Sequence, residues 1–527
     1  MKKIYILILL SICLNLGCGD DFLTLNDPNA VGSSLFYKNY KQFNQALNAA
    51  YDPLQWQGTY GQMIVFLNIL ASDIAVAGSS ATDQSSRLLQ FDDFSITSDN
   101  NFIRIMWQNH FSGVYRSNIV LQNLTLNPEA LSEAEKNEIE GQARFLRALY
   151  YYNLVRIYGG VPVITDPNDF AQPRATVAEV YKNLIIPDLK LAVEMLQENI
   201  PHRADKPAAL ALLADVYLTL ASKVNAGEPG YPDEFNESEL WQAAYDYSSN
   251  IIDEYSFELN ENYSDNFNEE VENSGNDREI IFGVEFMNFK NEQVNWPYGL
   301  EGNWLQAWQL PRQSFLFPNI DGWGFANPVK EFVDSYAEGD LRKDWDVLGP
   351  NQTIVFDTVS FTQPTAQPAG TIGSNTGYSF IKWAKGNIRN INNDWSSNPI
   401  DVPVARYAEI LLINAEAALM LNKHEEAKEG INQVRVRAGL EPLDEVIRED
   451  IMEERKFELA NEGNRWFDLT RRGEAYFLQK INPDNFNSPG AEIKGSLVTA
   501  NHMLMPIPLS EIDASEVINV KDQNPGY

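Results

Sequence analysis

The feature that most constrains the fold is a set of segments with helical periodicity spread along the chain. In Glu138–Tyr158, EIEGQARFLRALYYYNLVRIY, apolar side chains recur about every 3.6 residues, which predicts one long amphipathic helix. Gly159 and Gly160 are expected to end this helix. Five further segments have the same helical character: Lys206–Ala221, Trp241–Tyr255, Val404–Leu421, His424–Leu440 and Glu449–Gly463.

Small residues at the expected contacts indicate how these helices pack. The alanines of Lys206–Ala221, KPAALALLADVYLTLA, let neighbouring helices approach closely. Pairs of short helices with small residues between them resemble tetratricopeptide hairpins. We therefore predict a mostly α fold in which residues 29–256 and 402–527 form a scaffold of such helix pairs.

Residues 257–401, between the two helical parts, differ in composition. Asn, Gly, Pro and aromatic residues dominate there, and only short runs such as Glu279–Phe286 (EIIFGVEF) are typical of strands. A long irregular stretch in a compact protein is usually functional, because binding loops are carried on a rigid scaffold. The sequence therefore predicts that 257–401 is an aromatic-rich ligand-binding region.

The first residues have the pattern of an export signal. Two lysines precede the apolar run Ile4–Leu14, which is too short to cross a bilayer, since that takes about twenty residues. The sequence LNLGC that ends at Cys18 resembles a bacterial lipoprotein cleavage site, although Asn15 stands where leucine is usual. We expect residues 1–17 to be a signal peptide, Cys18 to be lipidated, and 18–28 to be a flexible acidic tether. The alternative is a cysteine within an ordinary signal peptide.

Composition and motifs exclude several classes of function. The 73 acidic residues against 40 basic ones give a net charge of -33, which repels phosphate backbones, so nucleic acid is not an expected partner. Because Cys13 and Cys18 are the only cysteines, the mature chain has no disulfide and depends on its core for stability. The histidines lack metal-ligand spacing, and no nucleotide-binding motif is present, so neither a metal nor a cofactor is expected.

The acidic cluster in Glu449–Gly463 is the strongest catalytic candidate. Glycosidases need two carboxylates about 5 to 9 Å apart on opposite sides of the scissile bond. Glu454, Glu458 and Glu462 instead fall on one face of one helix. The sequence therefore predicts a structural charged network, formed by Arg455, Glu458, Glu462, Arg465 and Asp468.

Six blocks of the chain carry a family resemblance: Gly141–Val163, Val404–Leu419, Ile431–Leu440, Glu453–Gly473, Pro506–Ile512 and Asp522–Tyr527. They resemble, in order and over essentially the whole chain, the SusD/RagB family of starch-utilisation-type surface lipoproteins of Bacteroidetes. The resemblance implies a mostly helical SusD-like fold with four tetratricopeptide-like helix pairs and a lipid anchor at the outer-membrane surface. It also implies a SusC-like TonB-dependent transporter as partner, and a protein that binds glycans, less often peptides, and is not an enzyme.

Tryptophan is concentrated in the irregular region. A sugar ring has an apolar face of C–H groups and a rim of hydroxyls, which flat aromatic faces and polar donors recognise together. The alternative is that several of these aromatic residues are core, since Trp308 and Leu305 would share a helix face. Two further candidates, Trp56 and Asp73, come from the N-terminal half. The predicted ligand-binding residues are Trp56, Asp73, Trp296, Tyr298, Trp304, Trp308, Arg312 and Trp323.

The ligand is expected to be a neutral polysaccharide or oligosaccharide, with β-glucan favoured. Acidic polymers are disfavoured because Arg312 is the only Lys or Arg in the aromatic stretch Asn295–Pro328. An oligopeptide-binding relative would use strand addition or charged pockets instead of an open aromatic surface. A glycoside hydrolase is disfavoured by the carboxylate geometry.

Overall fold

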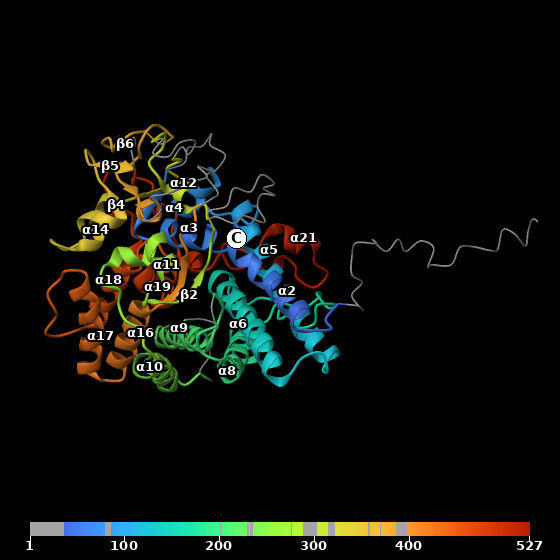
Figure 1. Ribbon diagram of the computed structural model, residues 1–527. Helices are drawn as coiled ribbons and strands as arrows, with labels where there is room; N and C mark the ends of the chain where they lie inside the picture. The colour runs from blue at the N-terminus through green and yellow to red at the C-terminus, as the bar shows by residue number, and fades with distance from the viewer. Residues whose placement is uncertain are drawn as a thin grey trace, which may run out of the picture.

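The structure is a computed structural model that describes residues 36–78, 86–200, 202–228, 231, 235–275, 277–287, 303–314, 322–356, 359–368, 370–385 and 398–527. Helices dominate it, as predicted (Figure 1). Cys18, with the signal peptide and tether predicted around it, lies outside the described residues.

Two 26-residue helices, α5 (Asn101–Leu126) and α6 (Glu133–Tyr158), pack together in the N-terminal part. A capping box between Ser132 and Glu135 begins α6, and Gly159, with φ +75°, ends it where the sequence predicted. The helix starts earlier than its apolar periodicity indicated, because the capping box extends it into a polar segment. The other helices of this part are α2 (Tyr40–Tyr51), α3 (Met63–Leu70), α4 (Leu89–Asp93), α7 (Val177–Val180), α8 (Ile186–Met195), α9 (Lys206–Asn225) and α10 (Glu237–Glu254).

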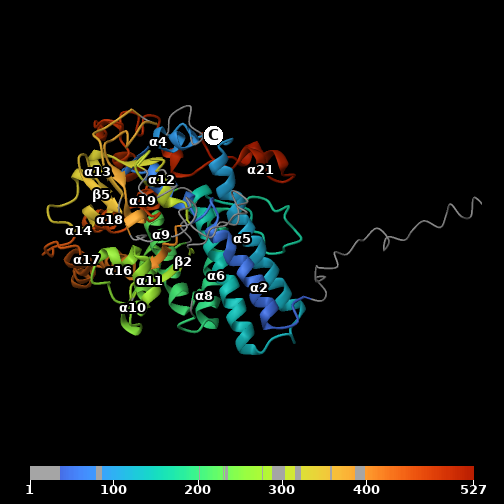
Figure 2. The same ribbon diagram turned by 45° about the horizontal axis from the view of Figure 1, so that its top comes forward.

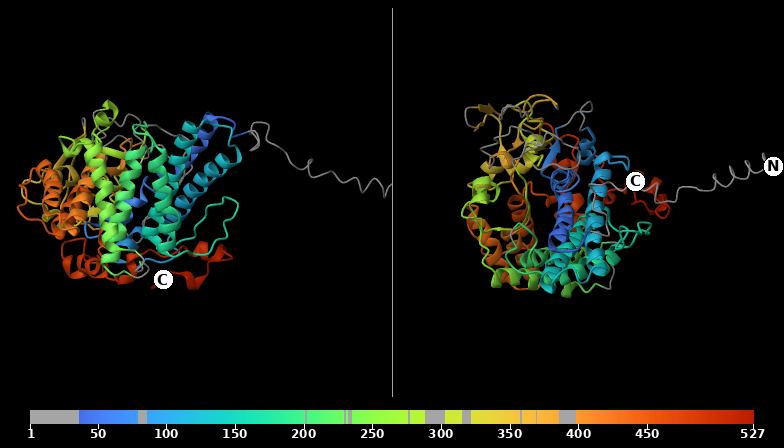
Figure 3. Two further views of the ribbon diagram at one scale, coloured as in Figure 1. Left: turned by 90° about the horizontal axis from the view of Figure 1, so that it is seen from below. Right: turned by 45° about the vertical axis from the view of Figure 1, so that its right-hand side comes forward.

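Consecutive helices pack in pairs, and the pairs join the two ends of the chain. α9 packs on α10, and α16 packs on α17, while α10 against α16 connects the N-terminal and C-terminal helical parts (Figures 1 and 3). Within the described part of the chain, α9 alone has the length and hydropathy of a membrane span, and it is buried in the protein core. The C-terminal helices are α16 (Tyr407–Met420), α17 (His424–Arg437), α18 (Arg448–Glu458), α19 (Arg465–Arg471), α20 (Glu474–Lys480) and α21 (Leu509–Ala514).

The helix predicted from Val404 begins later than expected. Residues Val402–Arg406 form strand β8, which pairs antiparallel with β2 (Ile280–Val284), so α16 starts only at Tyr407. Pro403 and the β-branched Val402 and Val404 favour the extended backbone. The strand predicted within Glu279–Phe286 is confirmed as β2.

Short elements make up the region between the helical parts. Its longest helices among the described residues have six residues each, and its strands form two-stranded antiparallel sheets. The helices are α11 (Glu269–Ser274), α12 (Leu305–Gln309), α13 (Lys330–Asp334), α14 (Leu341–Asp346) and α15 (Lys382–Lys385). The paired strands are β1 (Ala75–Ala77) with β3 (Ala326–Pro328), β4 (Val347–Leu348) with β7 (Ser379–Phe380), and β5 (Thr353–Phe356) with β6 (Val359–Thr362).

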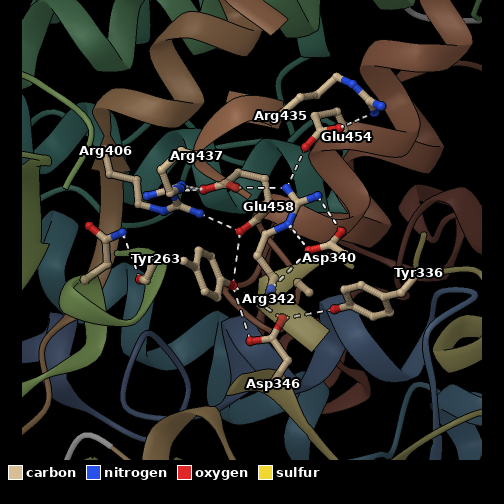
Figure 4. A network of polar contacts seen from close by, with 12 residues as sticks. Tyr263, Tyr336, Asp340, Arg342, Asp346, Arg406, Arg435, Arg437, Glu454 and Glu458 are labelled. Carbon is tan, nitrogen blue, oxygen red and sulfur yellow. Dashed lines mark hydrogen bonds and ion pairs between the residues drawn. The ribbon is translucent and has the colours of Figure 1, made fainter. Parts of the chain in front are cut away.

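A buried network of ion pairs fixes this middle region onto the C-terminal helices (Figure 4). Arg342, in the first turn of α14, donates to three buried carboxylates: Asp340 (2.7 Å), Glu454 (2.5 Å) and Glu458 (3.0 Å). Because Glu454 and Glu458 belong to α18, these contacts lock α14 against that helix. We call the contacts of Arg342 and Arg406 the buried ion-pair network.

Arg406, the last residue of β8, makes the second half of this network. It donates to Glu279 (2.7 Å), Glu458 (2.5 Å) and Glu462 (2.8 Å). Burial alone would raise the pKa of Glu458, but the guanidinium groups around it outweigh burial and hold that pKa below its usual value. Glu458 and Glu462 have the predicted structural role, but their partners Arg342 and Arg406 were not in the predicted network. Of the other predicted members, Arg455 pairs with Asp468 at 2.9 Å.

Candidate functional site

Four aromatic rings gather around the short helix α12. The ring centroid of Trp308 lies 5.9 Å from that of Trp304, 5.6 Å from that of Trp323 and 5.0 Å from that of Phe325. We call these four residues the α12 aromatic cluster. The rings meet edge to face or tilted, which is the arrangement that aromatic pairs prefer.

Two phenylalanine side chains from the N-terminal part pack against the cluster. Phe66 of α3 and Phe102 of α5 meet the ring of Trp308 edge-on, with centroids 5.5 Å and 6.3 Å away. The cluster therefore rests directly on two helices of the scaffold.

Three amide side chains hold α12 at its ends. The Asn303 side chain accepts from the backbone N–H of Leu305 (3.0 Å) and donates to the carbonyl of Ile400 (2.7 Å). At the other end, the side-chain amides of Gln309 and Asn461 exchange hydrogen bonds of 2.8 Å and 2.7 Å. These contacts tie α12 to the segment before β8 and to the turn after α18.

Arg312 and Trp323 are held side by side at the outer edge of the cluster. The backbone N–H of Trp323 donates to the carbonyl of Ala307 (2.8 Å), and the Arg312 guanidinium donates to the Trp323 carbonyl (3.1 Å). Gly324, at φ +60°, permits this approach, because a Cβ there would lie 3.1 Å from the Arg312 Cβ. Both Arg312 and Trp323 are half-buried. We call them the Trp323–Arg312 edge.

Burial corrects the assignment of three predicted platform residues. Trp304 and Trp308 are only 2% and 5% exposed, so neighbouring rings cover them, and the alternative that they are core is the correct one. Trp56 is likewise buried, with the Arg116 guanidinium 4.8 Å from its ring centroid. A sugar needs an open aromatic face, which these three residues do not offer.

Asp73 is also structural rather than ligand-binding. Its carboxylate accepts two hydrogen bonds from Arg465, at 2.7 Å and 2.6 Å. Burial would raise the pKa of Asp73, but Arg465 outweighs this effect and lowers it to about 2. The pair links the end of α3 to α19.

Trp296 and Tyr298 lie outside the described residues, so their role stays a prediction. The same holds for Arg312 and Trp323, which the structure places together without testing whether they bind. Phe325 of the cluster was not predicted from the sequence, nor were Phe66 and Phe102, which pack against it. For Phe325, its position two residues after Trp323 was a usable signal, because alternate residues of an extended segment share a face.

The carboxylates of the acidic cluster are not placed for catalysis. Glu454, Glu458 and Glu462 are at most 4% exposed, and each accepts from buried basic groups. A substrate therefore has no path to a pair of opposed carboxylates here. Over the described ranges, no group of three or more His, Cys, Asp or Glu is arranged to hold a metal ion.

Comparison of this chain with known proteins finds matches to two family models and to several relatives. Residues 278–527 match the model described as "SusD family", and residues 21–218 match the one described as "Starch-binding associating with outer membrane". A SusD-like protein of Formosa agariphila is 26% identical over 100% of both chains. The starch-binding protein SusD of Bacteroides thetaiotaomicron is 25% identical over 76% of this chain and 74% of its own.

A solved structure extends the likeness to the fold. A laminarin-binding SusD-like protein is 25% identical and superposes with a TM-score of 0.72, over 93% of this chain and 100% of its own. The predicted SusD-like fold is thereby confirmed.

Proposed function

Since this chain belongs to the SusD/RagB family, we propose that it is a non-catalytic surface lipoprotein that captures a neutral polysaccharide or oligosaccharide. It delivers this ligand to a SusC-like TonB-dependent transporter in the outer membrane. The observation that carries the proposal is the Trp323–Arg312 edge, where a half-buried indole and a guanidinium sit on a rigid aromatic cluster. An indole face suits the C–H side of a sugar, and a guanidinium donates to its hydroxyls.

The favoured ligand is a neutral β-glucan. The laminarin-binding relative supports this choice, and the net charge of -33 disfavours acidic polymers. Starch, an α-linked glucan, is the ligand named for the relative from Bacteroides thetaiotaomicron, so both linkages belong in the test.

Membrane attachment rests on Cys18 and on the family. The model that matches residues 21–218 is described as associating with the outer membrane, which supports anchoring at that membrane. Acyl chains contribute about 0.8 kcal/mol per buried CH₂, so several chains on Cys18 retain a globular domain at a membrane. Replacement of Cys18 by Ser is expected to release the protein from the membrane fraction.

A binding and turnover panel tests the proposal. Residues 19–527, which contain the whole described fold, are titrated with β- and α-glucans, xylan, mannan, a charged polysaccharide and a casein-peptide mixture. The expected result is binding of a neutral glucan without release of reducing ends. Binding of peptides alone contradicts the ligand class, and steady hydrolysis of the polysaccharide contradicts the non-catalytic role.

A further inference from the structure

One cavity lined by described residues lies away from the α12 aromatic cluster. It has a volume of about 1050 Å³ and is formed by α5, the loop after α6 and the segment around α21. α21 lies beside α5 in both views of the ribbon (Figures 1 and 2). Tyr115 in this cavity is thirteen residues after Phe102 on α5, about 20 Å along the helix. We call this cavity the α5–α21 cleft.

Two exposed aromatic rings stand at the mouth of the cleft. Tyr115 of α5 and Phe170 of the loop after α6 are 41% and 56% exposed. Their centroids are 5.6 Å apart and their planes meet at 41°, so the two rings are tilted and do not stack face to face. Exposed aromatic faces placed together in a concavity are a feature of binding sites.

Further aromatic side chains line the cleft behind this pair. Phe111 and Trp107, one and two turns before Tyr115 on α5, contact each other with centroids 4.8 Å apart. Trp107 is buried and Phe111 half-buried, which gives the cleft a fixed apolar wall. A rigid wall of this kind requires little reordering when a ligand binds.

Polar groups border the aromatic surface. Gln108 Nε2 donates to Glu511 Oε1 (3.2 Å), which leaves that carboxylate with acceptor positions for hydroxyl groups. Ser515 Oγ accepts from the backbone N–H groups of Val517 and Ile518 and keeps its own hydrogen to donate. Gln172, on the loop, adds an amide.

The charge of the cleft selects against anions. Glu511 and Glu516 line it, and Arg116, the only cation among the described lining residues, is paired with Asp52 at 2.6 Å. A ligand with hydroxyl groups and an apolar ring face, and without negative charge, matches these surroundings.

We propose that the α5–α21 cleft is a second, independent binding site for a neutral oligosaccharide, with Tyr115 and Phe170 as its platform. This inference takes its class of ligand from the proposed function, whereas the location of the site follows from the residues that line the cleft. A flat protein surface is a poorer match than a sugar chain, because aromatic and polar side chains together line a concavity.

The test counts sites by calorimetry on residues 19–527, with laminarihexaose and maltohexaose as probes. The wild type is expected to bind two molecules of one probe per chain. Tyr115→Ala with Phe170→Ala is expected to weaken one site about tenfold or more, and Arg312→Ala with Trp323→Ala to weaken the other. Glu511→Ala, which removes a carboxylate that lines the cleft, gives a second, independent variant of the cleft. Val436→Ala, on the exposed face of α17, is the matched surface control and leaves both sites intact.

Each outcome separates this inference from the proposed function. One site, insensitive to the cleft variants and lost in the Arg312/Trp323 variant, overturns the second site and leaves the proposed function standing. Absence of binding to any glycan overturns both. If the cleft variants keep both glycan sites but lose a protein partner in co-purification, the cleft is a protein interface and the inference is overturned.

Discussion

The buried ion-pair network and the α12 aromatic cluster are anchored to the same C-terminal elements, yet they meet solvent differently. The Glu454 and Glu458 carboxylates, paired with arginines, are at most 2% exposed. In the α12 aromatic cluster, by contrast, Trp308 is buried and Trp323 is half-buried. The buried charges of the network hold elements of the fold together, while the half-buried Trp323 is where we propose that a ligand binds.

The physical reason is the different cost of burying each kind of group. A buried charge must keep its partners, since removal of one leaves the other uncompensated in a poorly solvated site. An aromatic ring has no charge that needs a partner, so part of its surface can stay accessible to a ligand.

Replacement of Arg406 by Met is the largest expected perturbation. Three buried carboxylates, those of Glu279, Glu458 and Glu462, would lose their common partner. We expect the free energy of unfolding to fall by about 5 kcal/mol, at the upper end for breaking a buried pair. Denaturant unfolding followed by circular dichroism measures the change.

A solvent-exposed pair provides the control for this variant. Arg278 and Glu258 are 3.0 Å apart with side chains 67% and 64% exposed. Arg278→Met is expected to cost at most about 1 kcal/mol. If Arg406→Met and Arg278→Met lowered the free energy of unfolding equally, the structural role of the buried ion-pair network would be contradicted.

Truncation of Trp308 tests the buried side of the aromatic cluster. Trp308→Ala leaves a cavity among Phe66, Phe102 and Phe325, and we expect a loss of about 4 kcal/mol in unfolding free energy. Trp323→Ala, at the half-buried edge, should cost clearly less in the same thermal or denaturant assay. If the two variants lose equal stability, Trp323 is core and the Trp323–Arg312 edge is not a ligand surface.

The Asp73–Arg465 pair makes a pH-dependent contribution to stability. The folded-state pKa of Asp73 is lowered from 3.8 to about 2, so its contribution is fully present above pH 4 and is lost as pH falls towards 2. We expect Asp73→Asn to lower the unfolding free energy at pH 7 by about 2 kcal/mol. Unfolding curves at pH 7 and pH 3 measure the difference, which should shrink at the lower pH. A difference that stays constant or grows would show that the carboxylate charge is not the cause.

Local signals made most of the helical scaffold predictable. Gly159 was predicted as the end of α6 and is confirmed as its C-cap. The capping box of Ser132 and Glu135 is an equally local signal, but the prediction did not use it and began the helix too late. The strand β8 was missed although Val402, Pro403 and Val404 favour an extended backbone. Its partner β2 lies more than a hundred residues earlier, and the Val402–Arg406 segment has no alternation of its own.

The candidate site was less predictable because its environment comes from remote segments. Trp304 and Trp308 have the composition of a sugar platform, but Phe66 and Phe102, about two hundred residues earlier, cover Trp308. Asp73 was likewise assigned to ligand although its partner, Arg465, was already part of the predicted charged network. The α5–α21 cleft left no signal, because Tyr115, Phe170 and Glu511 are brought together only by the fold.

The most direct test of the central claim is a calorimetric titration of a neutral glucan into residues 19–527 and into the Trp323→Ala variant. The site at the Trp323–Arg312 edge should bind the glucan about tenfold more weakly in the variant, a loss of about 1.4 kcal/mol, with little change in melting temperature. Unchanged affinity in a folded Trp323→Ala protein would contradict the claim that a glycan binds at the Trp323–Arg312 edge of the α12 aromatic cluster.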